Sequence, residues 1–590
     1  MPENHTLYQE RLTSFRKEIK KSGLDGFIIP RTDEFQGEFL SPYAERLEWL
    51  SGFTGSAGIA IVTQEKAVVM SDGRYTIQLA QQVPTPLYHL GNSVDTSVGN
   101  WIIENVSGAC KIGYDLWLHT PGQVQKIEEA LADTGIELVP YDGHPIDMVW
   151  NDQPPRPANA ISIFPNEVAG KTSQEKRKAL GAQIQDADCQ ACLITVGDSI
   201  CWLLNIRGAD IDYSPLCLSY ALLYKDGRVD WFVDSRSISD SVRRHVGAGV
   251  NICELETIEK SIAGLKGCLA IDNNTTPVWF THVAQKHNVN TLGYDDPCVA
   301  PKAQKTQTEQ QAIKNAHIED GIAVVKFLHW LETSANIIDM SELSAERKLE
   351  EFRQESENYI APSFPTIAGF AENGAIVHYR ATTQTDKKIS GNSLLLVDSG
   401  GQYRWGTTDI TRTIAIGKPT QEMRENYTRV LKGHIAVADA CFSEDTRGKD
   451  IDALARAPLH DVGLDYAHGT GHGVGCNLCV HEAATSISPR SEATFQEGML
   501  ISNEPGYYEA GEYGIRIENL VLTQRVEEGF VFETVTLAPF DPRLICEDML
   551  NEGERAWLKS YAVLIYEALS SSLDQERQEW LRQYTVDIFR

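Results

Sequence analysis

One α/β pattern occurs twice in the N-terminal half of the chain, and this repeat constrains the fold more than any other feature. The first copy has an amphipathic helix, a buried strand, a Trp-Leu element and a strand pair at 5–22, 26–30, 49–50, 59–62 and 67–70. The second has a strand, a Trp-Leu element and a hairpin at 192–196, 202–203, 220–224 and 229–233. Helical and strand periods in this order predict α/β structure. We expect two domains, residues 1–157 and 158–303, joined at a proline cluster.

Residues 304–590 follow a different pattern. Thr306-x-x-Glu309 has the form of a capping box and predicts the start of a helix. Short strands with many glycine turns then occupy 365–540, with helices near 422–440 and 450 and a further helical segment at 554–585. This part of the chain is predicted to be an α+β domain, an antiparallel sheet backed by helices. A chain of 590 residues also exceeds what one hydrophobic core supports.

Composition excludes several classes of function. The formal net charge is −29, which disfavours binding to nucleic acid and to anionic membranes. The N-terminal segment has no apolar signal region, and no run of about 18 apolar residues predicts a membrane-spanning helix. The Cys-x-x-Cys pairs at 189/192 and 476/479 are 287 positions apart, so we expect reduced structural thiols of a cytoplasmic protein rather than a zinc site.

Two aspartates in the C-terminal part lie at or within predicted strands and are candidate ligands. Asp398 ends the apolar run 394–397, and a glycine turn follows it. Asp409 lies in the predicted return strand 405–413, eleven residues later. Such a spacing predicts two carboxylates that face each other across a hairpin. Either aspartate alone would more often be a turn cap or a solvated side chain.

A glycine-dense segment carries three histidines. His468 and His472 lie within Ala467–Gly475, and His481 follows six residues later. Four glycines in seven positions argue against a helix, so the i, i+4 histidine pair is not the helical zinc motif. Instead the glycines predict a loop in which the backbone closely approaches a ligand or a metal.

Two glutamates complete the candidate set. Glu504 and Glu518 each lie in or beside an apolar, strand-like stretch. Four carboxylates and one imidazole carry a charge of −4, which could be buried only if cations compensate it. Two divalent ions would do so, and the oxygen-rich donor set favours hard or borderline ions such as Mn²⁺. A metal pair of this kind can hydrolyse an amide without a covalent intermediate.

The sequence closely resembles the pita-bread metallopeptidases, and among them the three-domain, cytosolic aminopeptidase P group. The resemblance lies in His-Gly-Thr-Gly-His-Gly-Val-Gly, Val-His-Glu, Asn-Glu-Pro-Gly-Tyr-Tyr and Gly-Ile-Arg-Ile-Glu-Asn, and in motifs of both N-terminal copies. It implies that the two copies are creatinase-like domains and that residues 304–590 form the pita-bread catalytic domain. It also implies a cytoplasmic homodimer.

The resemblance also implies roles for individual residues. Asp398 would bind one metal through both oxygens, Asp409 and Glu518 would bridge two metals, and His472 and Glu504 would complete the other site. His378, His468 and His481 would contact the substrate or line its pocket, and Arg516 would support the bridging glutamate. Cys476, Cys479 and Asn503 depart from the residues common in the family, but none of them is a ligand.

The implied activity is the release of an N-terminal residue that precedes proline, by attack of a hydroxide that bridges the two metals. The substrates would be peptides with proline in second position. One alternative is a prolidase-type enzyme that cleaves only Xaa-Pro dipeptides. Creatinase shares the fold but uses no metal, and the five retained ligands argue against it. A pita-bread domain without catalysis, acting as a protein-binding module, is the alternative from another class.

Overall fold

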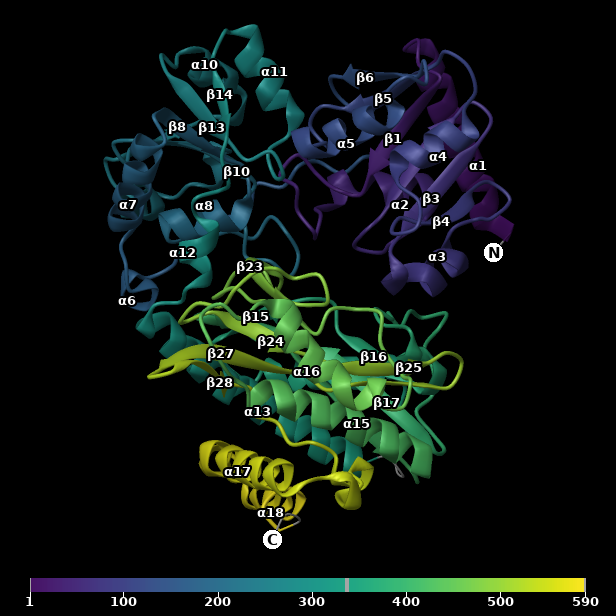
Figure 1. Cartoon of the computed structure of the whole chain (residues 1–590), viewed down its shortest axis with the longest axis vertical. Coiled ribbons are helices and arrows are strands. Elements are labelled where there is room, and N and C mark those ends of the chain that lie inside the picture. Colours follow the sequence, from purple (N-terminus) through teal and green to yellow (C-terminus); the bar gives the residue numbers. More distant parts are fainter. Residues whose placement is uncertain (1, 335–338, 588–590) are drawn as a thin grey trace. The chain divides into compact units, whose positions relative to one another are not determined.

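A computed structural model describes residues 2–334 and 339–587 of the chain. The chain forms two compact units (Figure 1). The N-terminal unit comprises Met1–Asn166 and Lys171–Cys298, and the C-terminal unit comprises Glu167–Gly170 and Val299–Arg590. The predicted boundary between two N-terminal domains at residue 157 lies inside the first unit and stays a prediction.

The N-terminal unit contains two six-stranded sheets. The strands of the first, in order, are β4 (His89–Asn92), β3 (Ala67–Ser71), β2 (Ile59–Thr63), β1 (Gly26–Pro30), β5 (Lys111–Asp115) and β6 (Glu137–Tyr141). Those of the second are β12 (Val250–Cys253), β11 (Val229–Val233), β10 (Ser219–Tyr224), β8 (Cys189–Ile194), β13 (Cys268–Ile271) and β14 (Thr291–Gly293).

The two sheets share one topology. In each, the central strand pairs antiparallel on one side and parallel on the other, as β1 does with β2 and β5, and β8 with β10 and β13. The outer strands also match, because β2–β3 and β10–β11 are antiparallel hairpins. The predicted α/β repeat is therefore confirmed.

The predicted amphipathic helix is α1 (Pro2–Lys21), and its apolar stripe forms part of a core. Leu12, Phe15 and Ile19 are at most 2% exposed and pack with residues of β1 and β2. The spacing of three and four residues puts these side chains on one helical face. The stripe therefore attaches the helix to the first sheet.

The C-terminal unit is α+β, and the strand pairs among its described residues are all antiparallel. Its largest sheet consists of β21 (Cys441–Phe442), β28 (Gly529–Thr534), β27 (Asn519–Val526), β24 (Leu500–Asn503), β22 (Gly471–Gly473) and β23 (Glu482–Ile487). Two three-stranded sheets are β16-β17-β20 (Ile367–Phe370, Ser393–Ser399, Ile410–Ile416) and β15-β18-β19 (Tyr359–Pro362, Gly401–Tyr403, Gly406–Thr407). A hairpin joins β25 (Gly506–Glu509) to β26 (Tyr513–Arg516).

Helices back these sheets, with α15 and α16 side by side in Figure 1. They are α12 (Val299–Ala303), α13 (Gln307–Ser334), α14 (Glu342–Arg353), α15 (Gln421–Ala438) and α16 (Gly448–His460). Two further helices pack on this layer, since α17 (Glu552–Leu569) contacts α13 and α15, and α18 (Gln575–Tyr584) contacts α13. The predicted capping box is present, because Thr306 N donates to Glu309 Oε2 at 2.9 Å and Glu309 N to Thr306 Oγ1 at 3.2 Å.

The C-terminal helical segment contains a break that the sequence analysis did not identify. Helix α17 passes into a short 3₁₀ turn at Ser570–Ser572, and α18 begins after a new N-cap at Asp574. Serine side chains compete for backbone hydrogen bonds and weaken a helix, which explains the interruption.

Within the described ranges, no helix has the length and apolar character needed to cross a bilayer.

The predicted return strand 405–413 is wrong as a continuous element. Residues 406–407 belong to β19 in another sheet, and β20 begins only at Ile410. Asp398 therefore pairs with Thr411, while Asp409 lies in the irregular step before β20. The extra turn through β18 and β19 displaces Asp409 from the position directly opposite Asp398.

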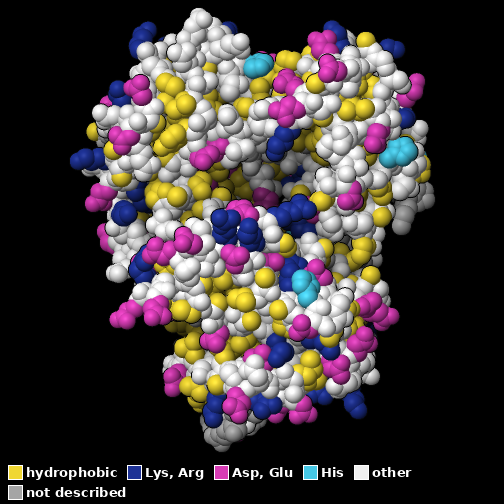
Figure 2. Space-filling view, viewed as in Figure 1, with side chains coloured by type: hydrophobic (Ala, Val, Ile, Leu, Met, Phe, Trp, Pro, Cys, Tyr) yellow, Lys and Arg dark blue, Asp and Glu magenta, His cyan; other side chains and the backbone are white. Residues whose placement is uncertain are grey.

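Charged side chains are distributed over the surface. In the space-filling view, Asp and Glu are spread over the face shown, with Lys and Arg between them (Figure 2). The negative net charge is thus not collected into one patch on that face.

Candidate metal centre

The five candidate residues of the C-terminal unit come from separate strands. Asp398 is the second-last residue of β17, Asp409 precedes β20, and His472 is the central residue of β22. Glu504 follows β24 directly, and Glu518 lies between β26 and β27. We call these five residues the acidic cluster.

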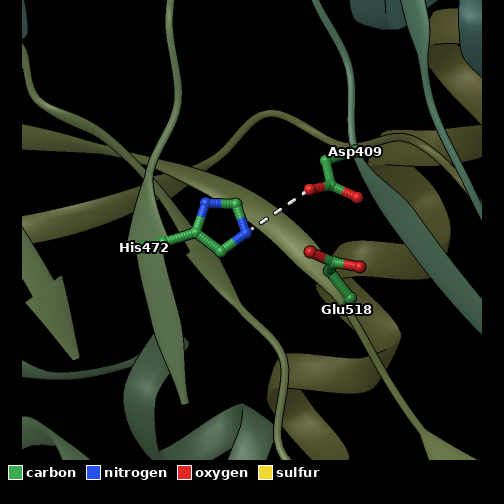
Figure 3. A group of neighbouring side chains, drawn as sticks. All are labelled: Asp409, His472 and Glu518. Atoms are coloured by element: carbon green, nitrogen blue, oxygen red, sulfur yellow. Dashed lines mark ion pairs between the residues drawn. The ribbon is translucent and has the colours of Figure 1, made fainter. Parts of the chain in front are cut away.

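Distances place the members of the cluster together. Ligand atoms of Asp409, His472 and Glu518 all lie within 4.8 Å of one another, and their side chains point toward a common centre (Figure 3). The Nε2 atom of His472 is 3.5 Å from Asp409 Oδ2 and 3.4 Å from Glu504 Oε1. These separations suit a cation held between the groups.

Backbone contacts orient the imidazole of His472. Its Nδ1 atom is 3.0 Å from the carbonyl oxygen of Gly473 and donates to it. The backbone N–H of His472 donates to Ser502 Oγ at 3.0 Å. Because Nδ1 carries the proton, Nε2 of the neutral ring can offer its lone pair to a cation held between Asp409 and Glu504.

Burial makes the carboxylates costly to ionise together. Asp398, Asp409 and Glu518 are 8%, 4% and 1% exposed. Desolvation raises the pKa of Asp398 to about 6, although the Arg516 guanidinium opposes that shift. Desolvation and the charges of Asp409, Glu504 and Asp398 hold the pKa of Glu518 well above its usual range.

The pKa of His472 is also raised, because negative charges surround its ring. Burial alone would lower the pKa of His472, but hydrogen bonding to Asp409 and the nearby negative charges raise that pKa to about 9. Asp398 Oδ1 is buried and has no hydrogen-bond partner among the described residues. Without a bound cation, clustered carboxylates repel one another, so their pKa values rise and some of their oxygens lack a partner. The acidic cluster shows both features, as expected for a cation site.

Arg516 connects several parts of the cluster. Its Nη2 donates to Asp398 Oδ2 at 2.6 Å, and its Nε donates to Thr411 Oγ1 at 3.2 Å. Thr411 Oγ1 in turn donates to Glu518 Oε2 at 2.8 Å. The guanidinium therefore holds Asp398 directly and reaches Glu518 through one hydroxyl.

Tyr508 is a functional candidate that the sequence analysis missed. Arg516 Nη1 donates to the Tyr508 hydroxyl at 2.6 Å, and that hydroxyl lies 2.8 Å from His468 Nε2. His468 Nδ1 donates to the Gly469 carbonyl at 2.7 Å, so Nε2 of the neutral ring accepts a hydrogen bond from the Tyr508 hydroxyl. The motif Asn-Glu-Pro-Gly-Tyr-Tyr contains Tyr508, but its spacing does not reveal which tyrosine points inward.

The other two candidate histidines lie beside this network. The His481 ring is exposed, and its centroid is 4.3 Å from that of His472, with the rings perpendicular. His378 is half-buried and follows Val377, whose carbonyl accepts from Arg516 Nη2 at 3.3 Å. Both positions are compatible with groups that face a substrate, and their roles stay predictions.

Comparisons with known proteins agree with this geometry. Residues 311–525 match the model of metallopeptidase family M24, and 529–588 match the C-terminal region of that family. Residues 11–149 and 152–309 each match a creatinase/prolidase N-terminal domain. The chain is 34% identical to a probable Xaa-Pro aminopeptidase P of Talaromyces marneffei, with 98% of this chain and 92% of the relative covered. This chain belongs to metallopeptidase family M24.

Further relatives within the M24 family span nearly the whole chain. Aminopeptidase P2 of Arabidopsis thaliana is 34% identical, with 97% of this chain and 87% of the relative covered. The crystal structure of X-prolyl aminopeptidase from Caenorhabditis elegans, described as a cytosolic enzyme with a di-nuclear active site, matches with a TM-score of 0.93 and 28% identity. That match covers 98% of this chain and 99% of the other. The fold is thus two creatinase-type N-terminal domains followed by an M24 catalytic domain.

Proposed function

We propose that this protein is a metal-dependent aminopeptidase that removes the first residue of peptides with proline in second position. The observation that carries the proposal is the full-length similarity to Xaa-Pro aminopeptidases combined with the buried acidic cluster. Four carboxylates and a histidine that converge in the catalytic domain can hold a metal pair, and such a pair can hydrolyse an amide.

The extent of the similarity favours an aminopeptidase over a prolidase. Prolidase from Pyrococcus horikoshii aligns with 62% of this chain, at a TM-score of 0.52 and 24% identity, and shares the fold. The nematode aminopeptidase aligns with 98%. The additional N-terminal domain is therefore a feature that this chain has in common with the aminopeptidases.

The acidic cluster fits two divalent cations. Asp398 and Asp409 would hold one ion and His472 and Glu504 would contribute to the other, with Asp409 and Glu518 shared between them. The unsatisfied Oδ1 of Asp398 and the raised pKa values of Asp398 and Glu518 support this assignment. Mn²⁺ is the ion that we propose, because oxygen ligands dominate and only one imidazole is present.

The chain's own residues would position the substrate and move the proton. When bound, the ions would supply an activated water and polarise the scissile carbonyl. Glu504 would accept a proton and deliver it to the leaving proline nitrogen. His378 and His481 would donate hydrogen bonds to the substrate, and Tyr508 would hold His468 through its hydroxyl.

Peptide length separates this proposal from prolidase activity. An Xaa-Pro-Xaa tripeptide should be cleaved at the first bond, with kcat/KM higher than that for the matching Xaa-Pro dipeptide. The leaving group is a tertiary amide nitrogen without an N–H, so recognition must rest on the proline ring and on the chain beyond it. Mass spectrometry of the products measures both rates. Cleavage of the dipeptide alone would favour the prolidase alternative.

We propose that the protein acts in the cytoplasm, because the similar nematode enzyme is described as cytosolic. We also propose a homodimer, which rests on the resemblance to the aminopeptidase P group alone. Analytical ultracentrifugation of the full chain measures the second point, since a monomer and a dimer differ twofold in mass.

A further inference from the structure

Two lysines in the first residues of the catalytic domain are buried against one glutamate. Lys302 lies in α12 and Lys305 two residues after this helix, while Glu482 is the first residue of β23. The Lys302 Nζ atom is 3.6 Å from Glu482 Oε1, and Lys305 Nζ pairs with Glu482 Oε2. All three side chains are 1% exposed. Because buried charges are expensive, this cluster requires an explanation.

The backbone around the lysines is fixed independently of the ion pairs. Lys305 N donates to the Gly498 carbonyl at 3.0 Å, and Gln310 Nε2 donates to the Lys305 carbonyl at 2.9 Å. Gln304 forms a β-bridge with Met499, immediately before β24. The segment that carries the lysines is therefore anchored to the sheet that carries Glu504, and it presents two ammonium groups at a fixed place.

The position of Glu482 in the sheet fixes the backbone beside His481. Glu482 pairs with Gly473, next to His472, and a Cβ on Gly473 would lie 2.6 Å from the Glu482 carbonyl oxygen. His481 lies in the bend directly before β23 and is bonded through the backbone to Glu482, whose side chain is buried while that of His481 is exposed. Anchoring Glu482 therefore fixes the backbone from which the His481 ring projects, 4.3 Å from the ring of His472.

We propose that Lys302 and Lys305, through Glu482, form a clamp that positions His481 over the metal centre for contact with the peptide. This inference rests on the proposed peptidase function. The three clamp residues are positioning residues, since none of them lies on the exposed side with His481. A clamp of this kind fixes a substrate-contacting ring more firmly than a free loop would.

A double-mutant cycle on the full-length, metal-loaded protein tests the clamp. The variants are Glu482→Gln, His481→Ala and the double variant, assayed for kcat and KM with an Xaa-Pro-Xaa tripeptide. Glu482→Gln should lower kcat/KM by about 10–100-fold in the wild-type background, the usual size for loss of a supporting contact. In the His481→Ala background the same change should cost less than about threefold, because its effect passes through His481.

Two further variants keep the test decisive. Lys302→Met leaves one ammonium and one carboxylate, so its charge is balanced, and it should lower kcat/KM by a few-fold, roughly threefold to tenfold. Glu533→Gln is the matched control, because Glu533 pairs with Lys314 on the surface of the same unit at 2.6 Å, and it should leave kcat/KM unchanged. Metal content should be the same in all variants.

Several outcomes would overturn the clamp. One is an unchanged kcat/KM in both Glu482→Gln and Lys302→Met. Another is an equal loss in Glu482→Gln with and without His481, which would mean that Glu482 only supports the fold. If the wild-type protein cleaves no tripeptide, the proposed function itself fails, and this result is distinguishable because it precedes any comparison of variants.

Discussion

Replacing Asp409 by asparagine should lower kcat/KM for an Xaa-Pro-Xaa tripeptide by about 1,000-fold or more, the loss expected when a metal ligand shared by two ions is removed. Asparagine preserves the volume of the side chain but removes a charge that is 4% exposed and lies 3.5 Å from His472 Nε2. The cluster would then carry too little negative charge to hold two dications.

The same variant should lose the stabilisation that metal provides. A ligand at 100 times its Kd stabilises the native state by about 2.7 kcal/mol, so the wild-type melting temperature should rise when metal is added. Asp409→Asn should show a smaller rise. The control is Asp461→Asn, an exposed change of the same charge in the same unit, which should behave as wild type. A fully active Asp409→Asn protein would contradict the assignment.

Replacing Arg516 should have the second-largest effect. Its guanidinium donates to Asp398, Tyr508 and Thr411 from three different nitrogens, and its side chain is 2% exposed. Arg516→Lys keeps the charge but provides no planar fork, so we expect kcat/KM to fall by about 10–100-fold.

Comparing Arg516→Met with Arg516→Lys separates the contribution of the positive charge from that of the planar guanidinium. Methionine leaves the buried Asp398 without its ion-pair partner, so the metal-free protein should lose about 3–5 kcal/mol of unfolding free energy. Added metal should recover part of that loss, because the cation replaces the missing positive charge. Chemical denaturation with and without metal measures both quantities. Arg525→Met, an exposed arginine of the same unit, is the control. Equal stability of the Met and Lys variants without metal would count against the role of Arg516.

The repeat could be predicted because apolar periodicity is local, whereas the strand order of the two sheets could not. The stripe of α1 and the hairpin β10–β11 are visible in short windows of the sequence, and both copies carry the same signals in the same order. The capping box at Thr306 and Glu309 is local in the same sense. These predictions needed no knowledge of long-range contacts.

The site could be predicted only in part, because its geometry depends on long-range pairing. The prediction that Asp398 and Asp409 are direct partners in a hairpin was wrong, since Asp398 pairs with Thr411 and the strands β18 and β19 intervene, although both carboxylates belong to the acidic cluster. The link from Arg516 to Tyr508 and His468 spans separate segments and has no signature in spacing. The Lys305–Glu482 pair joins residues 177 positions apart and was not visible at all.

Metal analysis of the full-length protein tests the central claim, which is that buried acidic groups are compensated by a pair of dications. After metal removal and reconstitution with Mn²⁺, elemental analysis should give two equivalents per chain, and tripeptide cleavage should appear only in the reconstituted sample. Full cleavage by protein that retains no divalent metal would contradict the account.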